Sequence, residues 1–380
     1  MPPPIPATRF ACCNSPSKVI LGKVRVKVWP RSFYGWATAD TQEGLDPTQS
    51  INMRIALLLS ILVSTVPPVS AEENVGYELV EVRKIWDAAR HNAFTDLIRF
   101  DGQWICTFRE ASAHGNSADG KVRVISSPDG KKWDSLALLE SKAGDLRDPK
   151  LSVTPGGQLM MDVVLATVNP QDGVRHRSQS FFSQDAKTWE GPLAKGDDNF
   201  WLWRSTWHDE TCFVVGYRTT LPREKRFTRL YRSRNGREFE KHVDQLYEEG
   251  AAGESTLLFR KDGSCVCLLR HEATARVGLS QSPYTDWTWK VTNERIGGPN
   301  VIQLADGRLV AAGRVYKPQQ HMALLWLDAE EGKLTRFLKL PSGGDCSYPG
   351  LVLHDGLLWV SYYSSHEGKS SSYLAKVRID

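Results

Sequence analysis

Residues 127–133 read Ser-Pro-Asp-Gly-Lys-Lys-Trp, and related stretches follow at 183–189 (Ser-Gln-Asp-Ala-Lys-Thr-Trp) and 233–239 (Ser-Arg-Asn-Gly-Arg-Glu-Phe). A degraded fourth copy occupies 280–287. The Asp or Asn of each copy can accept hydrogen bonds from the amides of a tight turn, and Gly allows a backbone angle that other residues rarely adopt. The closing aromatic can pack between strands. Recurrence of this turn predicts a fold made of repeated β-units.

Each of the three turns follows a hairpin pattern: an apolar run, a turn pair such as Asp-Gly, and a second apolar run. Six such hairpins cover 97–109, 151–166, 203–217, 257–270, 301–314 and 351–363. Their period of roughly fifty residues is typical of four-stranded propeller blades. The sequence therefore predicts an all-β fold, a six-bladed β-propeller of four-stranded antiparallel sheets. Residues 77–86 are expected to complete the last blade, because ring closure removes a sheet edge.

The N-terminal part of the chain has the pattern of a targeting segment. Met53-Arg54 is followed by the apolar run 55–66 and by small residues that end at Ala71. This pattern predicts a signal peptide over 53–71, cleaved after Ala71, and the apolar run is too short to span a bilayer as a helix. We expect a secreted or periplasmic protein with its propeller over 72–380 and a non-native, disordered extension over 1–52. The alternative is a genuine extension over 1–52 and a buried segment at 55–66.

Charge and cysteine content narrow the possible partners. Residues 1–71 hold seven of the 48 Lys and Arg and three of the 44 Asp and Glu, which leaves 41 of each in 72–380 and a formal net charge of zero. No Lys/Arg run stands out, so we expect no nucleic-acid partner, and no other apolar stretch is long enough for a membrane span. Five cysteines remain, an odd number, and no Cys/His spacing indicates zinc. We expect no cofactor and no metal, and the oligomeric state stays open.

Ionisable residues recur where the innermost strands of a propeller begin, around its central channel. Aligning the six units on their first strand gives one residue per blade: Phe94, Asp148, Trp203, Glu254, Gly298 and Tyr348. Asp96, Arg204 and Asn300 stand close to this position. The second strands end at the same rim, with Arg109-Glu110, Tyr217-Arg218, Arg270-His271, Arg314 and Tyr362-Tyr363. A structural channel would more often be lined by small or apolar residues, so these positions predict a functional rim.

The turn at 127–133 resembles the Asp-box of sialidases and related propellers, and the order Asp148-Pro149, Glu254, Arg270, Arg314, Tyr348 resembles exo-sialidases over nearly all of 77–380. The resemblance implies that Tyr348 is the nucleophile and Glu254 its base. It implies that Arg270 and Arg314 grip a substrate carboxylate, and we expect Asp148 to bind a sugar hydroxyl. The family takes its acid/base from the first blade, where Glu110 and Asp119 are the candidates and Asp96 is third.

A tyrosine nucleophile suits a sugar that carries a carboxylate at its anomeric carbon. A phenol has a pKa near ~10, so it needs a carboxylate to take its proton at neutral pH. A neutral phenol also approaches a negative substrate more easily than a carboxylate would, and sialidases are an exception to two-carboxylate glycosidases. The guanidinium group of an arginine can bind such a carboxylate through two parallel hydrogen bonds.

The sequence departs from the family in the first blade. Sialidases place their first clamp arginine in a Phe-Arg-Ile-Pro segment, whereas residues 91–97 read His-Asn-Ala-Phe-Thr-Asp-Leu. Arg109 and Arg147 are the candidates to replace it, and a different sugar is the alternative. Further candidates for contact with the sugar are Trp203, Arg204, Asn300 and Tyr363, with Trp201 beside them. The histidines His91, His114, His271 and His366 are expected to be bystanders.

Three functions fit these residues. The first is a secreted exo-glycosidase of sialidase type that cleaves a terminal sugar, acidic or neutral, from a glycan. The second is a non-catalytic propeller that binds carbohydrate or protein. The third is a glycosidase that uses only carboxylates, such as Asp96, Asp148 and Glu254. The first predicts a hydrogen bond between Tyr348 and Glu254, and the second predicts an aromatic platform without such a pair.

Overall fold

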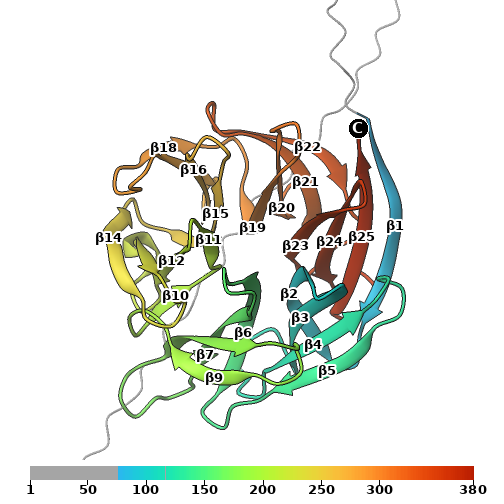
Figure 1. The fold of residues 1–380 in the computed structure, drawn as a ribbon, viewed down its shortest axis with the longest axis horizontal. Helices are drawn as coiled ribbons and strands as arrows, with labels where there is room; N and C mark the ends of the chain where they lie inside the picture. The colour runs from blue at the N-terminus through green and yellow to red at the C-terminus, as the bar shows by residue number, and fades with distance from the viewer. Residues whose placement is uncertain (1–75, 116) are drawn as a thin grey trace, which may run out of the picture. The chain divides into compact units, whose positions relative to one another are not determined.

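The computed structural model describes residues 76–115 and 117–380; the expected N-terminal extension and signal peptide lie outside these residues. The described strands form six antiparallel sheets that surround a common centre (Figure 1). The only helix of the described residues is the 3₁₀ turn η1 (Arg223–Lys225). The prediction of an all-β, six-bladed propeller with four-stranded blades is confirmed.

The strands follow one another from the centre outward in every blade. The innermost strands are β2 (His91–Phe100), β6 (Asp145–Val153), β10 (Phe200–Leu202) with β11 (Thr206–His208), β15 (Ala252–Phe259), β19 (Ile296–Gln303) and β23 (Cys346–His354). The second strands are β3 (Gln103–Ala111), β7 (Leu159–Ala166), β12 (Thr211–Arg218), β16 (Cys265–His271), β20 (Leu309–Val315) and β24 (Leu357–Ser364). The third strands are β4 (Lys121–Ser127), β8 (His176–Ser183), β13 (Thr228–Ser233), β17 (Arg276–Ser280), β21 (His321–Asp328) and β25 (Ser371–Ile379). The outer strands are β5 (Asp134–Leu139), β9 (Glu190–Ala194), β14 (Glu240–Tyr247), β18 (Thr288–Val291), β22 (Lys333–Lys339) and β1 (Tyr77–Trp86).

The sixth blade joins both ends of the described chain. β1 pairs antiparallel with β25, from Tyr77 opposite Ile379 to Trp86 opposite Ser372. The outer strand of this blade therefore comes from the beginning of the propeller, while its three inner strands come from the end.

The core lies between neighbouring blades. Each sheet packs against two others, so its second strand is buried on both faces and reads as a nearly continuous apolar run, as in Leu159–Ala166. Between blades five and six, for example, Val310 and Leu324 pack with Val360 and Ala375. Burial of this kind contributes roughly 25 cal/mol per Å² of apolar surface removed from water.

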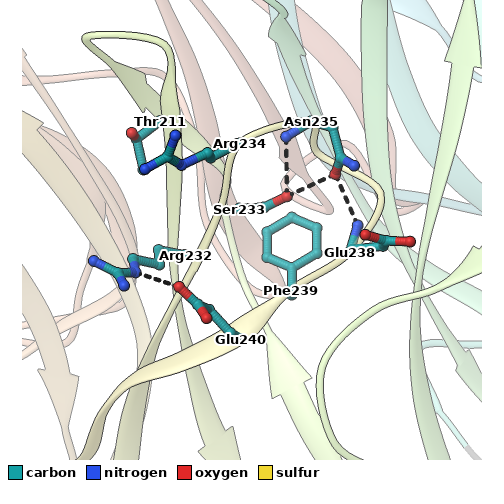
Figure 2. A pocket seen from close by; sticks show the side chains of 8 residues that line it. All are labelled: Thr211, Arg232, Ser233, Arg234, Asn235, Glu238, Phe239 and Glu240. Atoms are coloured by element: carbon teal, nitrogen blue, oxygen red, sulfur yellow. Dashed lines mark hydrogen bonds and ion pairs between the residues drawn. The ribbon is translucent and has the colours of Figure 1, made fainter.

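The recurring Ser-x-Asp/Asn stretches form tight turns between the third and outer strands. In the third turn the Ser233 hydroxyl accepts from the Gly236 amide at 2.9 Å, and the Asn235 side chain accepts from the Arg237 and Glu238 amides. Figure 2 shows the contacts of Asn235 with Ser233 and Glu238. Ser233 pairs with Cys212 at the start of β12. The opposite end of β12 pairs with β10, the strand with which blade three begins. The turns and the surface pocket beside this one therefore lie on the rim opposite the start of the inner strands.

Candidate active site

Each inner strand is interrupted at the position that the sequence alignment singled out. Strand pairing shifts at Phe94-Thr95, Asp148-Pro149, Gly253-Glu254, Gly298-Pro299 and Tyr348-Pro349, and residues 203–205 separate β10 from β11. A β-bulge bends its strand and re-aims a side chain. The repeated bulge explains how one residue of each blade comes to face the centre.

Three of these residues hold a backbone conformation that is costly for a side chain. Phe94, Asp148 and Tyr348 have φ angles of +67°, +51° and +51°. Non-glycine residues in this region cost of order 1–3 kcal/mol each and concentrate at active sites and ligand clamps. The strain indicates that the orientation of these three side chains is itself constrained.

Tyr348 and Glu254 form the central polar contact. The Tyr348 hydroxyl donates to Glu254 Oε1 at 2.7 Å, and the Arg270 guanidinium donates to both oxygens of the same carboxylate, at 2.8 and 2.9 Å. All three side chains are buried or nearly buried. Blades four and six thus contribute a phenol, a carboxylate and a guanidinium to one contact.

The surroundings shift the pKa values of Tyr348 and Glu254 in opposite directions. Burial, together with the charges of Glu254 and Asp148, raises the pKa of Tyr348 well above its usual value. Burial opposes ionisation of Glu254 as well, but the Arg270 charge and the Tyr348 hydrogen bond hold the pKa of Glu254 below its usual value. The shifts therefore favour a neutral phenol that donates a hydrogen bond to an ionised carboxylate.

Aromatic rings surround the phenol. The Tyr363 ring stacks against Tyr348 with centroids 5.9 Å apart, and Phe94 meets it edge-on at 5.1 Å. The Trp203 ring lies 5.1 Å from it on another side. These contacts fix the ring position and exclude water from it.

Asp148 presents a free carboxyl oxygen beside the pair. Its buried Oδ1 has no hydrogen-bond partner in the part of the chain that the structure describes, and burial raises its pKa above the usual value. Lys150, two residues on, is also buried and donates to the backbone carbonyls of Thr95 and Pro149. Burial lowers the pKa of this lysine to about 8.

Arg314 lies near Arg270 on the rim where the inner strands begin, which we call the opening. Its guanidinium lies near Tyr348, Tyr363 and Tyr316, and among the described residues neither its buried Nε nor the Tyr316 hydroxyl has a hydrogen-bond partner. Buried polar groups are normally hydrogen-bonded, so a group of them without partners requires an explanation such as a ligand. Of the five residues predicted to share one opening, Tyr348, Glu254 and Arg270 are in direct contact, and Asp148 and Arg314 lie near this group.

Asp345 forms a second polar cluster at this edge. Its carboxylate accepts from His91 at 3.0 Å, from His114 at 2.6 Å and from the Tyr363 hydroxyl at 2.9 Å. Burial would raise the pKa of Asp345, but the hydrogen bonds from His114 and His91 hold it far below its usual value. Tyr363 therefore connects this cluster to the ring of Tyr348.

Two of the proposed acid/base residues have other partners. The Glu110 carboxylate accepts from Trp86 at 2.6 Å and from Arg123 at 3.0 Å, on the side of β3 that faces blade six. Asp96 accepts two hydrogen bonds from Arg204, at 2.8 and 2.9 Å, and one from the Leu151 amide. Both carboxylates are held in internal contacts instead of facing the opening.

Asp119 is exposed in the loop between β3 and β4 and accepts from the Ser112 amide at 3.1 Å. Despite its partial burial, hydrogen bonds from Ser117 and Ser112 lower the pKa of Asp119. Of the three acid/base candidates in the first blade, it is the one whose side chain is exposed to solvent.

The arginines proposed to replace the missing clamp residue support the loop of the first blade. Arg109 is fully buried in a double hydrogen bond with Asp145, and Arg147 donates to the carbonyl of His114 at 2.9 Å. Asn300 donates to the Pro349 carbonyl at 3.0 Å and so connects blades five and six. These three residues and Arg204 all donate hydrogen bonds to other groups of the protein.

Several site residues were not identified from the sequence. Asp345, Tyr316 and Lys150 belong to no motif, and His91 and His114 were treated as bystanders. Tyr217, seen only as the end of a strand, stacks with Trp201 at the opening. Their roles depend on contacts between distant blades; His91 and Asp345 are 254 residues apart.

No known family model matches the chain, and no curated protein matches it. Solved structures do. A protein of unknown function from Dyadobacter fermentans matches with a TM-score of 0.72 at 19% identity, over 80% of this chain and 100% of that one. An α-L-arabinofuranosidase of Fusarium graminearum, in complex with arabinobiose, matches with 0.61 at 13% identity, over 79% and 98%. A Trypanosoma rangeli sialidase in complex with sialic acid matches with 0.61 at 12% identity, over 80% of this chain and 59% of that one.

The chain has the six-bladed propeller fold of these glycosidases. At such identities the likeness extends to the fold, and the chemistry has to be argued from the side chains. Among the described residues no helix has the length and apolar character that a membrane crossing requires.

Proposed function

We propose that the protein is a glycoside hydrolase that cleaves a terminal sugar from a glycan, with Tyr348 as nucleophile and Glu254 as its base. The observation that carries this proposal is the 2.7 Å hydrogen bond from a buried, strained tyrosine to a carboxylate whose pKa is lowered. A non-catalytic binding platform would have no use for this pair. Catalysis gives the pair a use, because a phenol attacks only when its proton has an acceptor.

The reaction takes two steps. The Tyr348 oxygen attacks the anomeric carbon while Glu254 accepts the phenolic proton, and the leaving-group oxygen takes a proton from an acid. In the second step the same acid, now ionised, removes a proton from water, which attacks the anomeric carbon. Tyr348 leaves and regains its proton from Glu254. Two displacements at one carbon predict retention of configuration.

We assign the acid to Asp148. Burial raises its pKa, which favours the protonated form that an acid requires, and its Oδ1 has no partner among the described residues. The pKa of Asp119 is lowered and its carboxylate accepts hydrogen bonds instead. Asp148 thus takes the acid/base role that the sequence analysis gave to Glu110, Asp119 or Asp96.

Two arginines beside the phenol favour an acidic sugar. Arg314 has an unpaired Nε, and Arg270 is engaged with Glu254 through a single nitrogen. Guanidinium groups bind carboxylates in a bidentate way. The half-buried Tyr217 ring, which lies near Arg270 and stacks on Trp201, suits a sugar face. Export through a signal peptide over 53–71 would bring such an enzyme to extracellular glycans.

A second candidate has a specific observation in its favour. Glu254 and Asp148 have pKa values shifted in opposite directions, which is the arrangement of a carboxylate base and a carboxylic acid in many glycosidases. In that case a neutral sugar is cleaved, and Tyr348 only orients Glu254.

Substitution of Tyr348 separates the two. The mature protein, 72–380, is assayed on aryl glycosides that include a sialoside, a glucuronide and an arabinofuranoside. If Tyr348 is the nucleophile, Tyr348→Phe lowers kcat/KM by at least ~10³-fold. The matched control is Tyr231→Phe, which also removes a buried hydroxyl bound to a carboxylate, Asp197, at 2.8 Å in blade three. Activity retained in Tyr348→Phe would favour the carboxylate mechanism, and no hydrolysis by the wild type would contradict both.

A further inference from the structure

Two histidines and an aspartate converge at the edge of the opening although they come from three separate segments. His91 begins β2, His114 lies in the loop after β3, and Asp345 directly precedes β23. Their donor atoms, His91 Nε2, His114 Nδ1 and an Asp345 carboxylate oxygen, all lie within 4.8 Å of one another. We propose that this cluster is a binding site for a divalent transition-metal ion such as Zn²⁺.

The donor set has the right chemistry and nearly the right spacing. Two imidazoles and one carboxylate bind zinc and iron in proteins and leave coordination positions open for water or substrate. Bonds of ~2.0–2.1 Å in a tetrahedral arrangement place ligand atoms about 3.4 Å apart. Both histidine nitrogens already point at Asp345 Oδ2, at 3.0 and 2.6 Å. An ion therefore requires each ligand to move by less than about 1 Å.

Neighbouring groups hold the ligands in place. The Tyr363 hydroxyl donates to Asp345 Oδ1, which leaves Oδ2 to the two histidines. The loop that carries His114 is fixed by Arg109, which donates to the Ala113 carbonyl at 2.8 Å, and by Arg147, which donates to the His114 carbonyl. Outer groups of this kind orient metal ligands and strongly affect affinity.

The cluster is also accessible. The His114 side chain is 53% exposed and that of Asp345 is 27% exposed, whereas His91 is nearly buried. An ion can therefore enter from solvent, and positions on its outer side remain free. Phe94 packs against both imidazoles, with centroids 6.0 Å from His91 and 5.2 Å from His114.

A bound ion would supply positive charge at the first blade. Residues 91–97 of this blade lack the clamp arginine that sialidases carry in the corresponding segment. Arg314 NH1 lies 3.7 Å from Asp345 Oδ1, so ion and guanidinium would stand on either side of one carboxylate. Together they would attract an anionic group on the sugar. This part of the inference rests on the proposed function and predicts coupling: an acidic sugar tightens metal binding, and the metal tightens sugar binding equally.

The test is calorimetric titration of Zn²⁺ into tag-free protein that has been stripped with a chelator. We expect one Zn²⁺ per chain, and an affinity at least ~100-fold weaker in His114→Ala. His242→Ala is the control, because His242 is a half-buried histidine of β14, outside the cluster, whose Nε2 lies near the Pro283 carbonyl. Co²⁺ should give a visible absorption band in the wild type and in His242→Ala only. Absence of Zn²⁺ binding in the wild type, equal binding by His114→Ala, or equally tight Mg²⁺ binding would overturn the proposal.

The coupling is measured by repeating the titration with saturating glucuronate or sialic acid. A Zn²⁺ affinity raised at least ~5-fold supports the clamp role, and an unchanged affinity overturns that role while the metal site stands. Zn²⁺ binding by a protein that hydrolyses no glycoside would instead contradict only the proposed function.

Discussion

Gly298 lies directly against the ring of Tyr348. A Cβ at residue 298 would stand 2.5 Å from Tyr348 Cδ1, and Gly298 has a φ of +56°. The blade-five bulge thus leaves room for the phenol of blade six, because its centre-facing position has no side chain.

Gly298→Ala should therefore displace Tyr348 and reduce activity. Gly263→Ala is the control, because Gly263 has a φ of +80° but nothing within 4 Å of an added Cβ. Both variants should lose about 1 kcal/mol of folding free energy from the unfavourable backbone angle. Only Gly298→Ala should lose most of its kcat. Equal activity in the two variants would show that the position of the Tyr348 ring does not matter.

Glu254→Gln should affect both catalysis and stability. The phenol loses its proton acceptor, so kcat should fall by ~10²–10⁴-fold. Arg270 loses the carboxylate that binds it, which should lower the free energy of unfolding by about 3 kcal/mol in chemical denaturation. Glu272→Gln in the same blade removes a more exposed partner of Arg223 and Arg295, and should cost under ~1 kcal/mol. A stable, active Glu254→Gln protein would remove Glu254 from the mechanism.

Activity should fall at both low pH and high pH. Glu254 must be ionised, and its pKa is lowered, so activity should persist to a lower pH than for an ordinary glutamate. Asp148 must be protonated, and its pKa is raised, so activity should be lost as pH rises through that raised value. Asp148→Asn should abolish the alkaline limb and spare kcat/KM, but not kcat, for substrates with good leaving groups, whereas Asp119→Asn should keep the profile. The reverse pattern would assign the proton donor to Asp119.

Asp96→Asn should unfold the protein more readily without touching the chemistry. Asp96 is 1% exposed and binds Arg204 through two hydrogen bonds. Loss of one partner from a buried pair costs about 3–5 kcal/mol. The double variant Asp96→Asn/Arg204→Met should recover part of this loss in thermal denaturation. An Asp96→Asn protein of normal stability and no activity would instead show that Asp96 is catalytic.

The repeat made much of this site predictable. Because each blade begins with a similar hairpin at a period of roughly fifty residues, alignment placed Phe94, Asp148, Trp203, Glu254, Gly298 and Tyr348 at one level, where the structure interrupts its inner strands. The resemblance to sialidases then paired Tyr348 with Glu254, and the hydrogen bond between them agrees with it.

Side-chain direction and contacts between blades were not predictable in the same way. Arg109 and Glu110 are neighbours on β3, yet alternation sends Arg109 to Asp145 and Glu110 to Trp86, on opposite faces of the sheet. The sequence alone did not show which face of β3 is turned toward the opening. His114 reaches Asp345 across 231 residues through a loop without regular structure, and no local pattern encodes that contact.

The nucleophile can be identified most directly by trapping the glycosyl-enzyme. The protein is mixed with a fluorinated glycosyl fluoride of the sugar that it hydrolyses, quenched in acid, digested and sequenced by mass spectrometry. We expect one glycosyl group per chain, on the oxygen of Tyr348, and none in Tyr348→Phe. A label on Glu254 or Asp148, or steady turnover with no covalent label, would contradict nucleophilic attack by Tyr348.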